Sequence, residues 1–278
     1  MFGAIPKPAW SRRYPCDEHN GCLLAMRCAL VRPGDGRFIL VDTGCGDKQL
    51  PQLGYYRFCG LKSLEAQLNA RGVSCRQITD VVLTHLHFDH CGAATVRDRD
   101  SGDVRPAFPN AVYWVGETQW HNCRQPHPLE KDSYFTENIQ PVADAGKLRL
   151  VAEDTELCRG VRLRLYNGHT PGQLAVYADS PGETMVFAGD VVPLAASVSP
   201  AWISAYDLSP LVSYAEKIRM LDEAAAQGQR MVFCHDAYTV SARIKKVGDF
   251  YKTYGCERTG DGVPTKQTGH GNTKKIVR

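Results

Sequence analysis

The chain has 278 residues, of which 43% are hydrophobic and 23% charged, with a formal net charge of +3. These values are typical of an ordinary globular protein with one large core or two modest ones. The longest apolar runs are strand-sized, as at residues 38–41, and none approaches the roughly 20 apolar residues of a membrane span. Neither a membrane segment nor a membrane partner is expected.

The two ends of the chain bear on location and partners. Residues 1–10 contain no apolar run ending in small residues, so we expect no secretory signal and a cytoplasmic protein. Residues 256–278 hold sparse basic side chains among Gly and Thr, without interleaved aromatics. We expect a flexible basic tail there that binds no nucleic acid, after one domain over residues 1–255. Eleven cysteines, an odd number without a CxxC pair, indicate reduced and mostly buried thiols.

The sequence of the first half of the chain predicts short buried strands that are followed by polar loops. Residues 38–44 are a short apolar run ending in Asp-Thr-Gly, which is typical of a buried strand leaving a sheet. Three leucines at helical spacing before Gly72 predict a helix over residues 61–71. Residues 78–84 form another β-rich run, and it ends at His85.

The second half predicts further strands and one strong helix. Ser209-Pro210 can begin a helix, because Ser caps the N-terminus and Pro suits the first turn, and Gly228 can end it. Strands precede the first helix and adjacent strands recur later, so an α/β fold of two sheets sandwiched between helices fits better than strict βαβ alternation. The strand-like runs are 161–166, 174–178, 184–188 and 231–234. The expected apolar face of the helix is Leu211, Tyr214, Ile218, Leu221 and Ala225.

The densest chemical signal follows the strand at residues 78–84. His85, His87, Asp89 and His90 fall within six residues, whereas a solvated polar loop rarely carries four such side chains together. Imidazole and carboxylate are ligands suited to zinc. A turn carrying His-x-His can direct two imidazoles at one ion while the following Asp-His faces a second.

Two metals need further ligands, and isolated His and Asp residues do follow later strands. His169 begins His-Thr-Pro-Gly, Asp190 closes Val-Phe-Ala-Gly-Asp, and His235 closes Met-Val-Phe-Cys-His. Each stands where a buried strand leaves its sheet, a position from which rigid scaffolds present functional groups. Gly168 and Gly189 are expected to let the backbone approach the ions closely.

His-x-His-x-Asp-His followed by a lone His, a lone Asp and a lone His resembles the metallo-β-lactamase superfamily. Val-Asp-Thr-Gly at residues 41–44, Gly-His-Thr-Pro-Gly at 168–172 and Gly-Asp at 189–190 are similar to that superfamily's signature segments, in its order. The likeness covers roughly residues 20–240. It implies an αββα sandwich of two mixed sheets flanked by helices, with residues 1–255 as the metallo-β-lactamase-type domain.

Within this likeness, residues 84–92, 108–111 and 205–210 look most like the quorum-quenching N-acyl homoserine lactonase and YtnP-like branch. One residue departs from that branch. Its well-known members carry a substrate-orienting tyrosine three positions after the bridging aspartate, where this chain has Pro193. We consider Tyr206 as the residue that orients the substrate instead, with a packed tyrosine as the alternative.

The resemblance also implies the metal ligands. Asp42 is expected to accept a hydrogen bond from a ligand histidine and to set its tautomer, and Cys91 to pack rather than to bind metal. A carboxylate can span two cations, which an imidazole does poorly, so the bridging role suits Asp190. The implied sets are His85, His87 and His169 for a first metal, Asp89, His90 and His235 for a second, with Asp190 bridging them.

The expected cofactors are two divalent metal ions, with zinc favoured and iron, cobalt or manganese as alternatives. A hydroxide shared by the ions would attack a lactone carbonyl, and Asp89 or a water would protonate the leaving alkoxide. The expected substrate is a small-molecule ester or lactone, and a homodimer is considered as the assembly. Phosphotriesterase, arylesterase or thioesterase activity on the same site is the alternative, with an iron-dependent oxidoreductase less favoured because His87 stands where diiron flavoproteins of this fold carry Glu.

Overall fold

The apolar run before Asp42 forms a fully buried strand, as the sequence predicts. In the computed structural model, which describes residues 1–260, this strand belongs to a five-stranded sheet of order β1-β2-β3-β6-β7. Only β1 is antiparallel to its neighbour, and the other pairs are parallel. Parallel strands are buried on both faces, which explains their continuous apolar runs. The strands are β1 (Ala29–Val31), β2 (Ile39–Val41), β3 (Asp80–Val82), β6 (Val112–Gly116) and β7 (Leu148–Val151).

A second sheet contains seven strands in the order β14-β13-β12-β11-β10-β9-β8. Only β11 and β12 are parallel neighbours, and helix α6 (Pro210–Gln227) lies between them in the chain. A parallel pair needs such a crossover. The strands are β8 (Thr155–Cys158), β9 (Val161–Tyr166), β10 (Gln173–Ser180), β11 (Glu183–Phe187), β12 (Arg230–Val232), β13 (Thr239–Val247) and β14 (Phe250–Arg258).

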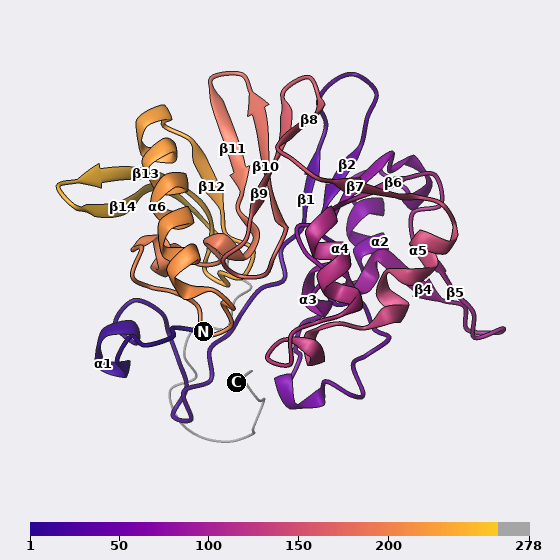
Figure 1. Ribbon diagram of the computed structural model, residues 1–278, viewed down its shortest axis with the longest axis horizontal. Helices are drawn as coiled ribbons and strands as arrows, with labels where there is room; N and C mark the ends of the chain where they lie inside the picture. Colours follow the sequence, from indigo (N-terminus) through magenta and orange to yellow (C-terminus); the bar gives the residue numbers. More distant parts are fainter. Residues whose placement is uncertain (261–278) are drawn as a thin grey trace.

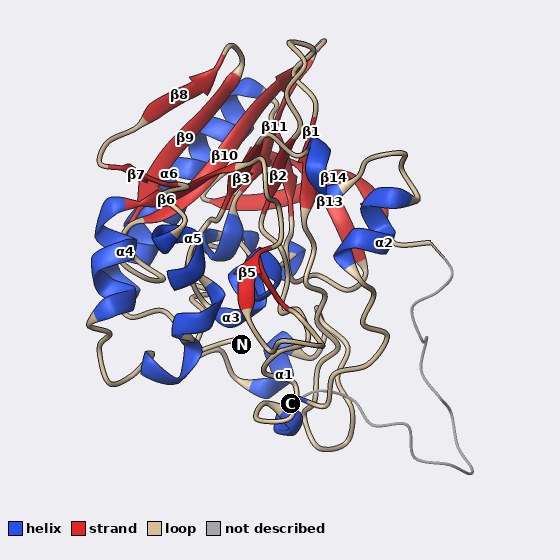
Figure 2. Cartoon of the chain, turned by 90° about the vertical axis from the view of Figure 1, so that its right-hand side faces the viewer, coloured by secondary structure: helices blue, strands red, loops and turns tan. Residues whose placement is uncertain are grey.

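The two sheets pack against each other between helices (Figures 1 and 2). One core cluster joins them, with Ile39 and Val82 of the first sheet against Leu174 and Val176 of the second. A second cluster fills the space between α6 and the second sheet, and a third lies on the helical side of the first sheet. This arrangement confirms the predicted αββα sandwich. The other helices are α1 (Lys7–Trp10), α2 (Leu64–Asn69), α3 (Phe88–Cys91), α4 (Glu117–Arg124) and α5 (Gln140–Asp144), and β4 (Thr95–Arg97) pairs with β5 (Val104–Pro106).

Helix α6 begins and ends where predicted, but its predicted apolar face is buried only in part: Leu221 lies in the core and Ala225 packs against it. Leu211 is 87% exposed and Tyr214 44% exposed, so these two members of the predicted apolar face do not pack into the core. Gly228 ends the helix with a left-handed φ of 64°, whereas the Ser209 side chain makes no capping hydrogen bond. The buried residues are Ser213, Lys217, Met220, Leu221 and Ala224.

Two predicted boundaries differ from the observed ones, at helix α2 and at the end of the domain. Helix α2 is shorter than the predicted 61–71, because Ser63 accepts a hydrogen bond from Ala66 N and caps it there. Strand β14 continues to Arg258, past the expected boundary at residue 255, and residues 261–278 of the expected tail lie outside the described residues. No helix among residues 1–260 is long and apolar enough to cross a membrane.

The eleven cysteines all lie within the described residues and are all free thiols. The expectation that they are mostly buried is wrong. Only Cys45, Cys91 and Cys234 are buried, and the others are partly or fully exposed.

Candidate metal centre

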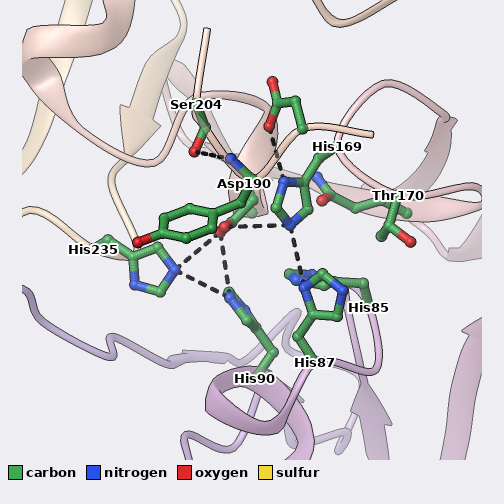
Figure 3. Close-up of polar contacts among 12 residues, drawn as sticks. His85, His87, His90, His169, Thr170, Asp190, Ser204 and His235 are labelled. Atoms are coloured by element: carbon green, nitrogen blue, oxygen red, sulfur yellow. Dashed lines mark hydrogen bonds and ion pairs between the residues drawn. The ribbon is translucent and has the colours of Figure 1, made fainter. Parts of the chain in front are cut away.

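All seven residues predicted as metal ligands lie together where strands leave the two sheets. Figure 3 shows the five histidines and Asp190. His85 follows β3, and α3 carries Asp89 and His90. Six of the seven residues are buried, and Asp89 alone is partly exposed. His169 follows β9, Asp190 follows β11 and His235 follows β12.

The ligand atoms form two groups around one carboxylate. In each group they lie within 4.8 Å of one another: His85, His87 and His169 in the first, and Asp89, His90 and His235 in the second. Asp190 Oδ1 lies 3.3 Å from His90 Nε2 and 3.1 Å from His235 Nε2, whereas its Oδ2 lies 3.5 Å from His169 Nε2. The two oxygens of Asp190 therefore face different groups.

Each of the five histidines has a partner on one ring nitrogen, which leaves the other nitrogen for the centre of the site. Such partners select the tautomer and orient the ring. The contacts are His85 Nδ1 with Thr84 Oγ1 at 3.1 Å, His87 Nε2 with Glu130 Oε2 at 3.1 Å, His90 Nδ1 with Asp42 Oδ2 at 2.7 Å, His169 Nδ1 with Asp207 Oδ1 at 2.9 Å, and His235 Nδ1 with the Ala25 carbonyl at 2.8 Å.

The donor set fits divalent cations. His85 Nε2 is buried and has no hydrogen-bond partner among the described residues, which is costly unless an ion or another group takes its lone pair. Imidazole nitrogens and carboxylate oxygens are common ligands of zinc and of other first-row metals. The arrangement can therefore hold two cations that share Asp190.

The charges in the site support the same conclusion. Burial would raise the pKa of Asp190, but His235, His90 and His169 outweigh it and hold that pKa well below its usual range. Burial would lower the pKa of His90, yet Asp89, Asp190 and Asp42 raise it well above its usual value. Protons thus balance the carboxylates in the metal-free site. Metal binding would displace these protons, because a ligand imidazole must be neutral.

Sequence reasoning placed Asp42 and Cys91 as the structure does. Asp42 contacts Nδ1 of a candidate ligand histidine, as predicted. Cys91 is buried and donates to the Leu86 carbonyl at 3.2 Å, and burial raises its pKa well above the usual value, so it stays a thiol.

Gly168 and Gly189, the two glycines singled out in the sequence, pack closely against neighbouring protein atoms. A Cβ on Gly168 would lie 2.4 Å from Ser213 Cα of helix α6, and one on Gly189 would meet Gln173 and Thr84. These glycines let backbone segments pack against neighbouring protein atoms. They were expected to make room for the ions.

Tyr206 lies close to the site although 54% of the residue is exposed. Burial of its phenol and the charges of Asp89 and Asp190 raise its pKa. The hydroxyl therefore stays protonated at neutral pH and can donate a hydrogen bond.

Three residues of the site were missed by sequence reasoning. Glu130 and Asp207 hold candidate ligand histidines, and the Cys234 thiol donates to Asp190 Oδ1 at 3.3 Å. Asp207 and Cys234 each stand next to a residue that had been singled out, which is a usable signal. Glu130 stands 43 positions from His87 in the segment after α4, where no local pattern marks it.

An aromatic cluster adjoins the second group of ligands. Phe88, which precedes Asp89, has ring-centroid separations of 5.3 Å to Tyr56, 6.5 Å to Phe58 and 6.3 Å to Phe135. Met26 and Leu53 pack in the same cluster. Apolar side chains thus surround Phe88, the residue that precedes Asp89 in helix α3.

Comparison with known proteins agrees with this geometry. A probable metal-dependent hydrolase from Staphylococcus aureus is 28% identical, with a TM-score of 0.81 over 92% of this chain and 91% of that chain. AidC, a dizinc quorum-quenching lactonase solved with a product, is 21% identical, with a TM-score of 0.66 over 83% of this chain and 79% of that chain.

An RNase J-like protein of Methanocaldococcus jannaschii is 24% identical over 175 residues, or 62% of this chain. The match spans only 35% of that relative. The model of the metallo-beta-lactamase superfamily matches residues 27–234, which is most of the chain. This match shows that the chain belongs to the metallo-β-lactamase superfamily.

Proposed function

We propose that the site holds two divalent cations and opens a lactone or a related small-molecule ester. The observation that carries the proposal is the position of Asp190, whose two oxygens face the two separate groups of ligand atoms. Zinc is the favoured metal, because four-to-five-coordinate sites of histidine and carboxylate suit it, with iron, cobalt or manganese as alternatives. The first cation would be held by His85, His87 and His169, and the second by Asp89, His90 and His235.

The proposed reaction adds water across the ester bond. Bound cations would lower the pKa of water to about 7 and polarise the substrate carbonyl. The water oxygen bonds to the carbonyl carbon, the ring C–O bond breaks, and the departing alkoxide needs one proton. We assign that transfer to Asp89, because it is the only partly exposed residue of the seven and follows Phe88 of the aromatic cluster in the chain.

The substrate class follows from the surroundings of Asp89. The cluster of Tyr56, Phe58, Phe88 and Phe135 favours an apolar acyl or aryl group beside the reacting carbonyl. The phenol of Tyr206 can donate a hydrogen bond to a substrate oxygen, which Pro193 cannot do. The fold shared with AidC, a lactonase, is consistent with this class.

Metal analysis coupled to a substrate panel tests the proposal. Protein purified without chelator should contain about two metal ions per chain and should hydrolyse lactones faster than aryl esters, thioesters or phosphotriesters. A single ion per chain would contradict the dinuclear site. If the protein instead preferred phosphotriesters or thioesters, the proposed metal site would stand but the proposed substrate class would be wrong.

Tyr206→Phe tests the orienting role separately. Loss of one hydrogen bond to a substrate oxygen should lower kcat/KM by about 10-fold or more while both metal ions remain bound. Tyr254→Phe, on strand β14, is the matched control and should leave kcat/KM unchanged. Equal rates for Tyr206→Phe and the parent would remove Tyr206 from the proposal.

A further inference from the structure

Helix α4 contacts both of the loops that supply the first group of ligands, the loop of His87 and the loop of His169. The buried side chain of Gln119, on α4, accepts a hydrogen bond from Leu86 N at 3.2 Å, between His85 and His87. Its amide donates to Thr170 Oγ1 at 3.0 Å and to the Pro171 carbonyl at 2.7 Å. Gln119 thereby connects the loop of His87 with the loop of His169.

Glu130 is the charged end of the same network. The residue is 5% exposed, and Oε2 accepts hydrogen bonds from His87 Nε2 at 3.1 Å, Thr170 Oγ1 at 2.9 Å and Tyr134 Oη at 3.0 Å. Asn122 Nδ2 donates to Oε1 at 2.6 Å. Four side chains thus place hydrogen-bond donors around this one carboxylate.

The contact with Glu130 gives His87 an orientation that differs from the other four histidines. His85, His90, His169 and His235 each use Nδ1 for the supporting contact, which leaves Nε2 for the site. His87 uses Nε2, so its Nδ1 faces the site, 3.3 Å from His169 Nε2. Without Glu130, nothing among these contacts would hold the proton of His87 on Nε2.

The second group of ligands is supported from another part of the chain. The Ala25 carbonyl holds His235 Nδ1, and the guanidinium of Arg27 donates to the carbonyls of Phe233 and Asp236 on either side of His235. None of the contacts described above for Gln119 and Glu130 involves this segment. The Gln119–Glu130 network therefore supports the first group and the Arg27 contacts support the second, whereas Thr84 and Asp42 connect to both groups.

We propose that Glu130 is a positioning residue for the first metal site alone, and that the two sites can be weakened independently. Glu130 sets the tautomer of His87 and, through it, adds negative charge next to the first cation. The hydrogen bonds of Gln119 and Thr170 fix the distance between the loop of His87 and the loop of His169. This inference rests on the proposed dinuclear site.

The test compares metal binding in Glu130→Gln and Arg27→Met, starting from metal-free protein titrated with Co²⁺ and followed by absorbance and calorimetry. Glu130→Gln removes the charge and should weaken one of the two binding steps by about 10- to 100-fold, leaving the other within about 2-fold. Arg27→Met should weaken the opposite step. Glu117→Gln, the same change at an exposed position of α4, should alter neither step.

A spectroscopic measurement on the unaltered protein tests the inference even if the variants fail to fold. Two-dimensional ¹H–¹⁵N spectra of the zinc-loaded protein should show one of the five ligand imidazoles protonated at Nε2 and four at Nδ1. The inference would be overturned if all five imidazoles were protonated at Nδ1, or if Glu130→Gln bound Co²⁺ with the same two affinities as the parent. Neither result would contradict the presence of two metal ions. A parent protein that binds no Co²⁺ would instead overturn the proposed function.

Discussion

Asp42 Oδ2 lies 2.7 Å from His90 Nδ1, across 48 positions of sequence. The same carboxylate accepts from Thr84 N at 2.7 Å and Thr84 Oγ1 at 2.9 Å, so it joins the ends of β2 and β3 at the point where the ligand loop begins. Asp42 adopts a left-handed φ of 57°, which Asp and Asn tolerate better than most residues. A strained backbone position at a site indicates that the surrounding structure holds it there.

Asp42→Asn should weaken the second metal site without unfolding the protein. Asn tolerates the same backbone conformation, but its neutral amide cannot accept all three hydrogen bonds or raise the basicity of His90. We expect affinity for one metal ion to fall by about 10- to 100-fold, measured by competition with a chelator. Asp35→Asn, in an exposed loop, is the control. Unchanged affinity in Asp42→Asn would show that the contact with His90 is dispensable.

Asp190→Asn should impair both metal sites together. The substitution keeps the size of the side chain but removes the charge shared by two groups of ligands. Hydrolysis of the best substrate should drop by at least about 100-fold, by analogy with single preorganised groups. Circular dichroism should show a folded protein, since the sheets are held by apolar burial.

The matched control for that change is Asp98→Asn, in the exposed turn between β4 and β5, where the carboxylate accepts only backbone hydrogen bonds from Asp100 and Ser101. Its activity should match the parent. Two bound metals and parental turnover in Asp190→Asn would contradict the bridging role.

Gly168→Ala should destabilise the protein through a backbone clash. The added Cβ would lie 2.4 Å from Ser213 Cα and 2.5 Å from Ser213 N, so helix α6 or the loop of His169 must move. Overpacking of this kind costs about 1–3 kcal/mol, which urea unfolding can measure. Gly54→Ala, where nothing lies within 4 Å of the added Cβ, should change the free energy of unfolding much less.

Lys217 should give the folded protein a distinctive pH dependence. The residue is 1% exposed and donates to the Trp202 carbonyl at 2.8 Å, and burial lowers its pKa from 10.5 to about 8. Between these two values the unfolded chain binds more protons at Lys217 than the folded chain does. Stability contributed by this residue therefore rises with pH from about 8 to about 10.5, and below about pH 8 the full penalty of the buried charge applies.

Comparison of the parent with Lys217→Met isolates the pH-dependent stability that Lys217 contributes, because all other groups titrate equally in the parent and in the variant. The free energy of unfolding of the parent, relative to the variant, should increase by roughly 3 kcal/mol across that window. Urea unfolding of metal-free protein at several pH values measures it, with the exposed Lys252→Met as the control. A relative stability that stays flat with pH would mean that Lys217 keeps its ordinary pKa in the folded state.

Local sequence predicted six of the fourteen strands among residues 1–260, namely β2, β3 and β9–β12, and the polar side chains that follow several of them. Apolar runs ending at Asp42, His85, Asp190 and His235 predicted both a buried strand and a polar group presented at the edge of a sheet, and the structure has both. This works because the length of an apolar run and the polar residue that ends it are properties of adjacent positions. The same runs favoured two sheets between helices, whereas the order of strands in each sheet was seen only in the structure.

Only the tertiary structure decided which distant groups meet. The predicted apolar face of helix α6 is exposed at Leu211 and Tyr214 but buried at Leu221. The packing also buries Met220 and brings Ser213 against Gly168. Glu130 reaches His87 from an irregular segment, where no periodicity signals a partner. Such contacts depend on how separate elements pack, so a linear sequence pattern does not contain them.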